Sequence, residues 1–189
     1  TAAKPFKRLE RKYQDIAAER ISLETPDKAN ANMLLGVNFP MRDDNPDYPA
    51  LLLANFMTGG GFLNSRLATR IRQKEGLSYG VGSGMSVSAE DEFGHFMSYA
   101  IFAPQNAEKL EKAFREELAR IVEKGFEPAE VKEATAGWLQ RQKMDRSQDQ
   151  RLVARLASNE YLGRDLAWYG ALEKKAAELT PLQIQEALI

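Results

Sequence analysis

The chain has 189 residues, and its 26 Lys and Arg nearly balance its 27 Asp and Glu, so the formal net charge is −1. This balance gives no basic field for a nucleic acid or an anionic membrane surface, and we expect neither partner. No apolar run approaches the ~18 residues that cross a bilayer. The absence of cysteine excludes disulfides, thiolate metal ligands and a cysteine nucleophile.

The single histidine, His95, limits the metal chemistry further. A catalytic zinc site is usually built from three protein ligands rich in His or Cys. The sequence contains neither HExxH nor HxxEH, the helical motifs that carry such ligands. We therefore expect no metal site in this chain and interpret His95 as a structural residue.

Before residue 76 the pattern predicts four elements, in the order strand, strand, helix, helix. They are Glu19–Glu24, Ala31–Phe39, a helix carrying Leu51–Met57, and Leu63–Lys74. Turn-forming residues separate the two strands at Thr25–Lys28. The first helix is expected to stop at Gly59-Gly60-Gly61, and Gly76 is the natural left-handed end of the second.

The clearest strand of the chain runs from Leu77 to Ser88 and is expected to pair with a return strand, Phe93–Ala103, as an antiparallel hairpin. Its period of two places Tyr79 on the same face as Val81. The opposite face is nearly bare, since it carries the glycines 80, 82 and 84. Such glycines weaken a strand, and a close approach by a packed helix or by an extended ligand would explain them equally well.

The second half of the chain is predicted to be helical, with apolar stripes at helical spacing. The signals that bound these helices are Gly125, Pro128, a capping box formed by Ser147 with Gln150, Gly163, and Thr180-Pro181 with Gln183. Strands that are not each followed by a helix indicate an α+β domain with a mixed, largely antiparallel sheet and helices packed on one face. We expect one such domain over residues 1–189, cut from a longer polypeptide because the chain starts without methionine and ends within a helical pattern.

Two clusters are candidates for function. Gly59, Gly60 and Gly61 follow a helix and lack the Gly-Lys-Ser/Thr of a phosphate loop, so we interpret them as a hinge or as a loop that passes close to another backbone. Arg72 and Tyr79 lie on either side of the reversal at Gly76, which could bring them to one end of the sheet. A guanidinium and a phenol suit a peptide carbonyl and a developing oxyanion, but Tyr79 could equally be part of the core.

The run from Ser65 to Val81, SRLATRIRQKEGLSYGV, resembles the inactive C-terminal-type domain of the pitrilysin/insulinase (inverzincin) zinc peptidases. The family pattern is an arginine, a Gly-Leu pair, and a tyrosine seven residues after the arginine. Here Arg72, Gly76-Leu77 and Tyr79 match it. The resemblance covers roughly residues 15–189 and implies the half-domain fold shared with the mitochondrial processing peptidases.

The resemblance implies that this domain works with a partner. In the family, an HxxEH-bearing domain holds zinc, and the opposite half contributes the arginine and tyrosine across a closed chamber. Arg72 would then hold a substrate carbonyl and Tyr79 would assist transition-state stabilisation, so the isolated domain should be inactive on peptides. The alternative is a catalytically silent scaffold or core-protein-like subunit of the same fold. By the resemblance to bacterial members of the family, we expect a periplasmic or cell-envelope location.

Overall fold

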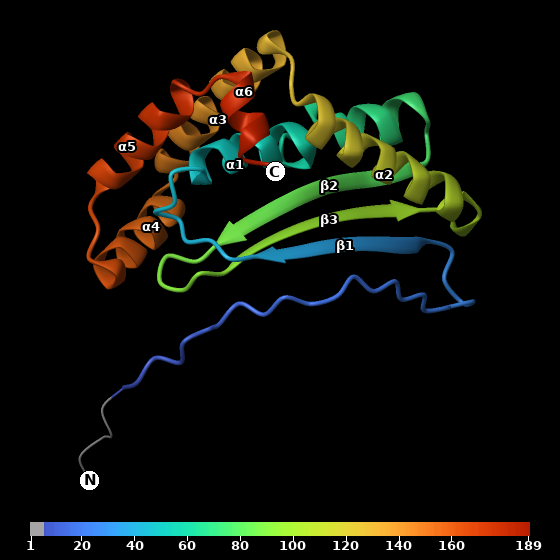
Figure 1. Ribbon diagram of the computed structural model, residues 1–189, viewed down its shortest axis with the longest axis horizontal. Helices are drawn as coiled ribbons and strands as arrows, with labels where there is room; N and C mark the ends of the chain where they lie inside the picture. Colours follow the sequence, from blue (N-terminus) through green and yellow to red (C-terminus); the bar gives the residue numbers. More distant parts are fainter. Residues whose placement is uncertain (1–5) are drawn as a thin grey trace.

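The computed structural model describes residues 6–189, so residues 1–5 at the start of the expected domain lie outside the described part. It has two layers, a curved antiparallel sheet and a layer of helices on one of its faces (Figure 1). The strands are β1 (Ala31–Phe39), β2 (Ser78–Val87) and β3 (Gly94–Phe102), in the spatial order β1-β3-β2. The expected α+β architecture with helices on one face is confirmed.

The helical layer begins between β1 and β2. There, α1 (Tyr48–Asn55) continues directly into the π-helical segment η1 (Phe56–Gly60), a short 3₁₀ turn η2 (Phe62–Asn64) follows, and the π-helical η3 (Ala68–Lys74) leads into β2. After β3 a 3₁₀ turn η4 (Pro104–Asn106) leads into the long helices. These are α2 (Ala107–Lys124), α3 (Pro128–Arg146), α4 (Asp149–Leu162), α5 (Leu166–Ala177) and α6 (Pro181–Glu186).

The apolar faces of these elements form two neighbouring cores. One lies between the sheet, η3 and α2, where Leu67, Ile71, Leu110 and Phe114 are almost fully buried against Ala100. The other joins α1 to the C-terminal helices through residues that include Leu53, Trp138 and Ile184. The periodicity that predicted the helices is therefore the periodicity of their buried stripes.

The π-helical segment η1 approaches β2 closely. A β-carbon added at Gly59 would lie 2.5 Å from the backbone nitrogen of Ser83. The Ser83 hydroxyl donates to the side-chain oxygen of Asn55 at 2.8 Å, which ties the end of α1 to the same strand. Glycine at position 59 is thus required by close approach of two backbones, one of the two interpretations offered by the sequence.

Several local expectations differ from the structure. Residues 19–24 are extended but form no strand, because no neighbouring strand pairs with them. The capping box at Ser147 is wrong, since its hydroxyl donates to the Met144 carbonyl and α4 begins after Gln148. The helix expected to stop at the glycine run continues through Gly60 as η1. At Thr180, by contrast, the capping box with Gln183 is present.

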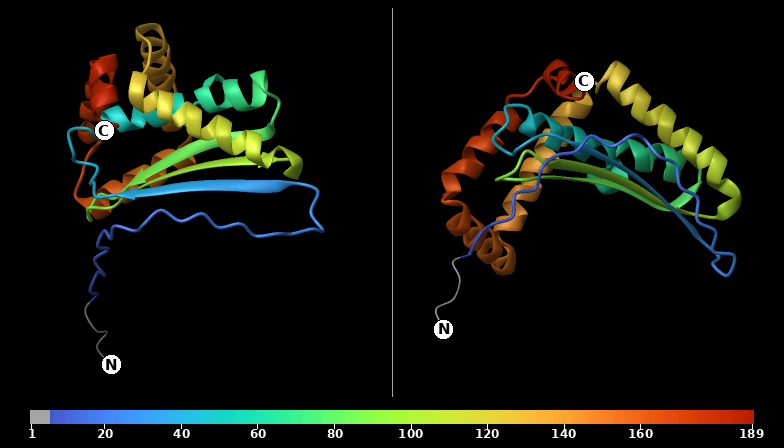
Figure 2. Two further views of the ribbon diagram at one scale, coloured as in Figure 1. Left: turned by 45° about the vertical axis from the view of Figure 1, so that its right-hand side comes forward. Right: turned by 60° about the horizontal axis from the view of Figure 1, so that its bottom comes forward.

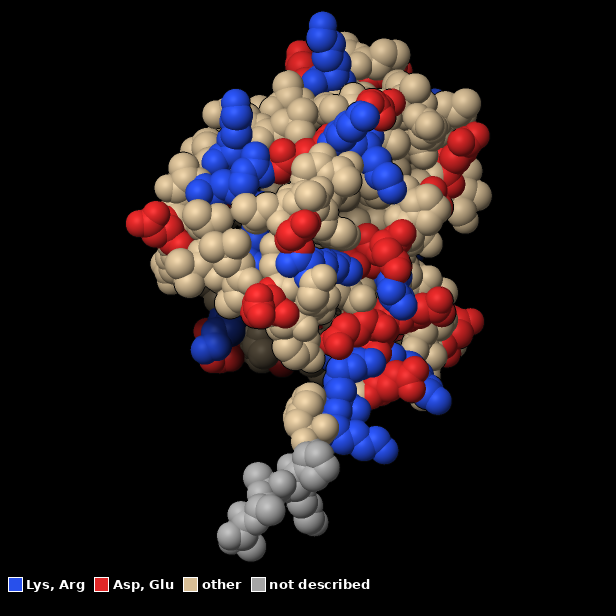
Figure 3. Space-filling model, turned by 90° about the vertical axis from the view of Figure 1, so that its left-hand side faces the viewer, with Lys and Arg blue, Asp and Glu red and all other residues tan. Residues whose placement is uncertain are grey.

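Charged side chains are mixed rather than gathered by sign on the face formed by α4 and α5, where blue and red groups alternate (Figure 3). Many of them are paired, as in Arg164 with Asp43 and Arg146 with Glu173. Within residues 6–189, no helix combines the length and the apolar character needed to cross a lipid bilayer.

The approach of η1 to β2 predicts opposite effects of one substitution at two glycines. Gly59→Ala should destabilise the domain by about 1–3 kcal/mol, because the new methyl group must push backbone away from backbone. Gly84→Ala should be neutral or slightly stabilising, because a β-carbon there meets nothing within 4 Å. Urea denaturation of both variants measures the difference; equal free energies of unfolding would contradict the proposed contact.

Candidate functional site

The short connection between η3 and β2 determines where Arg72 and Tyr79 lie. Arg72 is in the last turn of η3, and Gly76 reverses the chain with a φ of 62°. The backbone N–H of Leu77 then donates to the Ile71 carbonyl at 2.9 Å, which holds the start of the strand against the end of the helix. The left-handed glycine predicted at position 76 is confirmed, and the reversal brings two residues seven positions apart to the same end of β2.

The two candidate side chains do meet. The guanidinium carbon of Arg72 lies 5.9 Å from the centre of the Tyr79 ring, within the range of a cation–π contact. The Tyr79 side chain is 84% exposed, so it is not part of the core. Of the two interpretations that the sequence left open for Tyr79, the structure supports the accessible one.

A β-bulge explains why the strand period misplaced Tyr79. Ser78 is paired with Phe102 and Gly80 with Ile101, so two residue steps on β2 oppose one step on β3. Tyr79 is the extra residue, and the bulge turns it out of the alternation that would have placed it beside Val81. Bulges re-aim side chains in this way, and this one converts a core position into an exposed position.

Ser78 holds the bulge in place. Its side chain is buried, and its hydroxyl oxygen lies 2.7 Å from both the Gly80 and the Ile101 carbonyl oxygens. One hydroxyl proton is shared between these two acceptors, one on each strand. The serine thereby fixes the backbone on both sides of Tyr79.

Arg72 differs from the neighbouring arginines in its ion pairing. Arg70 bonds Glu75 at 2.9 Å and also bonds Glu116, and these bonds raise the pKa of Arg70 above its ordinary value. Arg66 binds Glu130 through two hydrogen bonds. Within the part of the chain that the structure describes, Arg72 takes part in no ion pair, so its guanidinium can donate to a carbonyl or carboxylate oxygen without breaking one.

The described residues do not form a site that fits a zinc ion. His95 is cross-strand paired with Asn38, and its Nδ1 lies 2.7 Å from the Asn38 side-chain oxygen. Over residues 6–189, no group of three or more His, Cys, Asp or Glu side chains is arranged to hold a metal. The structural interpretation of His95 is thus supported by its hydrogen bond.

The glycine run lies apart from the Arg72–Tyr79 pair, against the middle of β2. Gly59 and Gly60 belong to η1, and Gly61 follows it with a φ of −82°. The Arg141 guanidinium donates to the Gly60 carbonyl at 3.3 Å. The run is therefore a packed helix end, and its role as a hinge stays a prediction.

Comparisons with known proteins agree on one family. A family model described as the peptidase M16 inactive domain matches residues 2–137. A curated relative, an uncharacterized zinc protease of Streptomyces coelicolor, is 33% identical over 115 residues, which cover 61% of this chain and 24% of the relative. The chain thus spans about a quarter of that protein.

Solved structures show the same fold. A peptidase M16 inactive domain from Pseudomonas fluorescens superimposes with a TM-score of 0.74 at 24% identity, covering 85% of this chain and 38% of that one. A chain of complex III2 from Candida albicans superimposes with a TM-score of 0.70 at 15% identity, covering 86% and 40%. At these identities the likeness concerns the fold alone.

The bulge predicts a specific role for the Ser78 hydroxyl. Ser78→Ala should cost about 1–2 kcal/mol, because carbonyl oxygens that share its buried hydroxyl proton are left without it. The amides of Tyr79 and Gly80 should also exchange faster with solvent. Ser86→Ala, at an exposed position of the same strand, is the control and should change stability by less than about 0.5 kcal/mol. Unchanged exchange at Tyr79 in Ser78→Ala would contradict this role.

Proposed function

The chain belongs to the peptidase M16 inactive-domain family, and we propose that it is the half of a zinc metalloendopeptidase that binds substrate and stabilises the transition state without holding the metal. The observation that carries this proposal is the exposed pair of Arg72 and Tyr79, assembled by the Gly76 reversal and the bulge. The family match, the curated zinc protease relative and the M16 inactive-domain structure support it.

The two side chains would have different roles. Arg72 carries five N–H donors in a planar fork and lacks a carboxylate partner in the described chain, so it suits a peptide carbonyl or carboxylate. The Tyr79 phenol can donate one hydrogen bond to an oxygen on which negative charge develops. Because Tyr79 sits on a strand and Ser78 holds the backbone beside it, the backbone that carries the donor would already be fixed before the substrate arrives.

The rest of the reaction would have to come from a partner. Since residues 6–189 provide no set of ligands that fits a zinc ion, the metal and its bound water would belong to an HxxEH-bearing domain of the same family. That domain would be joined in one polypeptide or supplied as a separate subunit. The substrate would be an extended peptide lying between the two halves, and closure would exclude water from the site.

A scaffold role is the second candidate. The likeness to a chain of complex III2 favours it, since the same fold occurs there in a chain of a complex. In that case the Arg72–Tyr79 pair would contact no substrate, and its removal would leave any proteolysis by the assembly unchanged. The two proposals are therefore separated by the activity of the assembled protein.

Loss of one phenol oxygen tests the proposed role of Tyr79. In the peptidase formed with the HxxEH-bearing partner, Tyr79→Phe should lower kcat about tenfold or more with little change in KM, the weak end of the effect of removing one oxyanion donor. The matched control is Tyr161→Phe, at a tyrosine on α4 that is 64% exposed and remote from the reversal at Gly76. Equal kcat values for the two variants would favour the scaffold role.

Separation from the partner tests the division of labour. The chain alone should show no peptide hydrolysis and no stoichiometric zinc binding, because its described residues provide no ligand set. Activity should appear on addition of the HxxEH-bearing partner and disappear with a chelator. Peptide cleavage by the pure chain that a chelator abolishes would refute the proposal.

A further inference from the structure

Strand β1 has a free edge without the usual protection. It pairs with β3 in an unbroken register from Ala31 to Phe39 and with no other strand in the described part of the chain. Its sequence, ANMLLGVNF, contains no charged residue and no proline. Natural proteins usually protect such an edge with a bulge, a charge, a proline or a covering segment, because its unpaired amides and carbonyls invite another strand.

An extended segment of the same chain already runs beside this edge. Residues 6–25 pass along β1 in the opposite direction (Figures 1 and 2). One end is anchored by Arg8, whose guanidinium makes two 2.7 Å bonds to Asp91 in the turn between β2 and β3. The Arg8 guanidinium holds the pKa of Asp91 below its usual range. The guanidinium of Arg11 also lies over the Phe93 ring at 4.7 Å.

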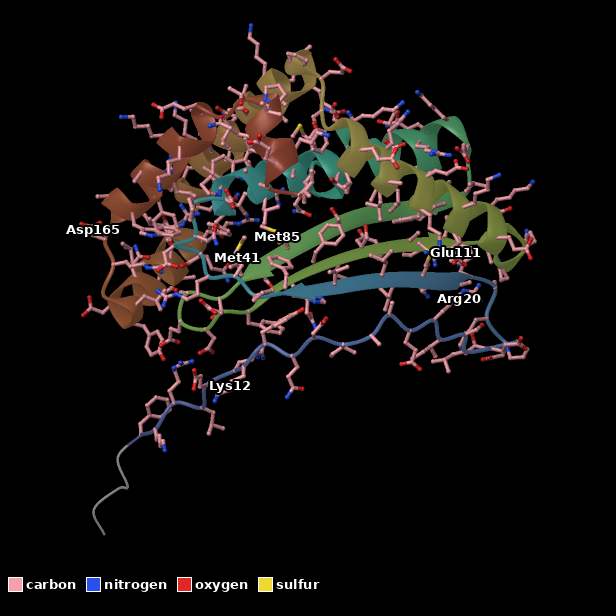
Figure 4. The ribbon with its side chains drawn as sticks, in the orientation of Figure 1. Lys12, Arg20, Met41, Met85, Glu111 and Asp165 are labelled. Carbon is pink, nitrogen blue, oxygen red and sulfur yellow. The ribbon has the colours of Figure 1, made fainter. Side chains whose placement is uncertain are left out.

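The other end is anchored by Arg20. Its guanidinium donates to Glu111 of α2 at 2.9 Å, and Figure 4 shows the two residues beside the same end of β1. Arg20 and Arg115 both bond this carboxylate, and they hold the pKa of Glu111 below its usual range. The stretch between the two anchors is of about the same length as β1, so an extended conformation would follow the whole edge.

The Arg20 anchor fixes which side of the segment would face the helices. Helix α2 packs over the helix-covered face of β1, against Ala31 and Met33. If the segment joined the sheet, Arg20 would have to lie on that same face to keep its bond to Glu111. Because side chains alternate, the even-numbered residues of the segment would face the helices and the odd-numbered residues would face the open side.

The turn at Thr25–Lys28 then sets the register. The Lys28 N–H donates to the Thr25 carbonyl at 3.0 Å, which closes a β-turn over Pro26 and Asp27. Continuing the pairing from this closed turn places Arg20 opposite Met33 and Ile16 opposite Val37. In this register Arg20 lies on the helix-covered face of the sheet, as its bond to Glu111 requires. The turn and the ion pair are separate observations, and they agree on this face.

The same register also matches exposed apolar side chains. Ile16 and Val37, now 71% and 52% exposed, would face each other on the helix-covered side. Ile21 and Leu34, now 69% and 70% exposed, would be diagonal neighbours on the open side. From these observations we infer that the outer edge of β1 is a strand-addition site, and that its occupant is this chain's own segment 16–24.

With that segment added, the sheet has four strands and β1 is no longer an edge. The strand predicted from the alternation of Ile21 and Leu23 then has a place in the fold. Occupancy by this segment also excludes a second copy of the chain or a foreign extended peptide from β1. The inference is independent of the proposed function, because it concerns the opposite edge of the sheet from Tyr79 on β2.

Paired cysteines test the register in a chain that has none of its own. The double variant Ile16→Cys/Val37→Cys should form an intramolecular disulfide under mild oxidation, because opposed residues bring their Cα atoms within bonding range. Ala17→Cys/Val37→Cys is the matched control. Its two side chains would point to opposite faces, and it should remain reduced under the same conditions. Hydrogen exchange should also show protection at alternate amides of β1 in the unmodified chain.

The anchor provides a second comparison. Arg20→Ala in the Ile16→Cys/Val37→Cys background removes the ion pair to Glu111 and should slow disulfide formation several-fold. Arg115→Ala removes the other arginine from Glu111 without touching the segment and should leave the rate unchanged.

Three results would overturn the inference. The first is equal oxidation of the two cysteine pairs, which would show a segment without register. The second is an intermolecular disulfide with a dimer in sedimentation, which would assign the edge to a second copy. The third is absence of exchange protection in β1 until an extended peptide is added, which would assign the edge to that peptide.

Discussion

The pairing of β2 with β3 is the interaction on which the proposed site depends. Its register carries one irregularity, at Tyr79, and that irregularity decides whether a phenol is buried or presented to solvent. The bulge itself depends on a buried serine hydroxyl shared between carbonyls of both strands. Gly59 of η1 packs against the middle of the same strand. The helical layer therefore fixes the middle of β2, and β3 fixes its first residues.

Local chemistry explains how much of this could be predicted from the sequence. The helices α2 and α3 carry stripes whose period is that of their buried faces, and Gly76 marks a reversal that only a residue tolerant of positive φ adopts easily. Such signals lie within a few residues of the feature they specify. For the same reason, the sequence could predict that Arg72 and Tyr79 lie close together, because their positions depend on one short connection.

The features that were missed depend on distant partners. Nothing in the residues around Tyr79 distinguishes a regular strand from a bulged one, because the extra residue is defined only by its register against Ile101 and Phe102. The failed cap at Ser147 has a local cause instead, since its hydroxyl donates to the Met144 carbonyl, three residues back in the preceding helix. Glycine 59 was ambiguous until its neighbour on β2 was known. Sequence periodicity predicts the helices and strands, whereas the bulge at Tyr79 and the close approach at Gly59 are determined by contacts between those elements.

The energetics of Arg72 and Tyr79 bear on which function the pair serves. A cation–π contact at an exposed site contributes about 0.5–1 kcal/mol, which is small beside the burial of Ile71 or Leu67 next to it. The pair therefore adds little to the free energy of folding, yet a bulge and a buried serine hydroxyl are needed to expose Tyr79 beside Arg72. The bulge lowers the regularity of β2, and a strand selected for stability alone would be better served by an unbroken ladder. This local departure from the most stable arrangement exposes a phenol beside a guanidinium that has no ion pair within residues 6–189. A purely structural role gives no reason for it, whereas the proposed substrate-binding role would.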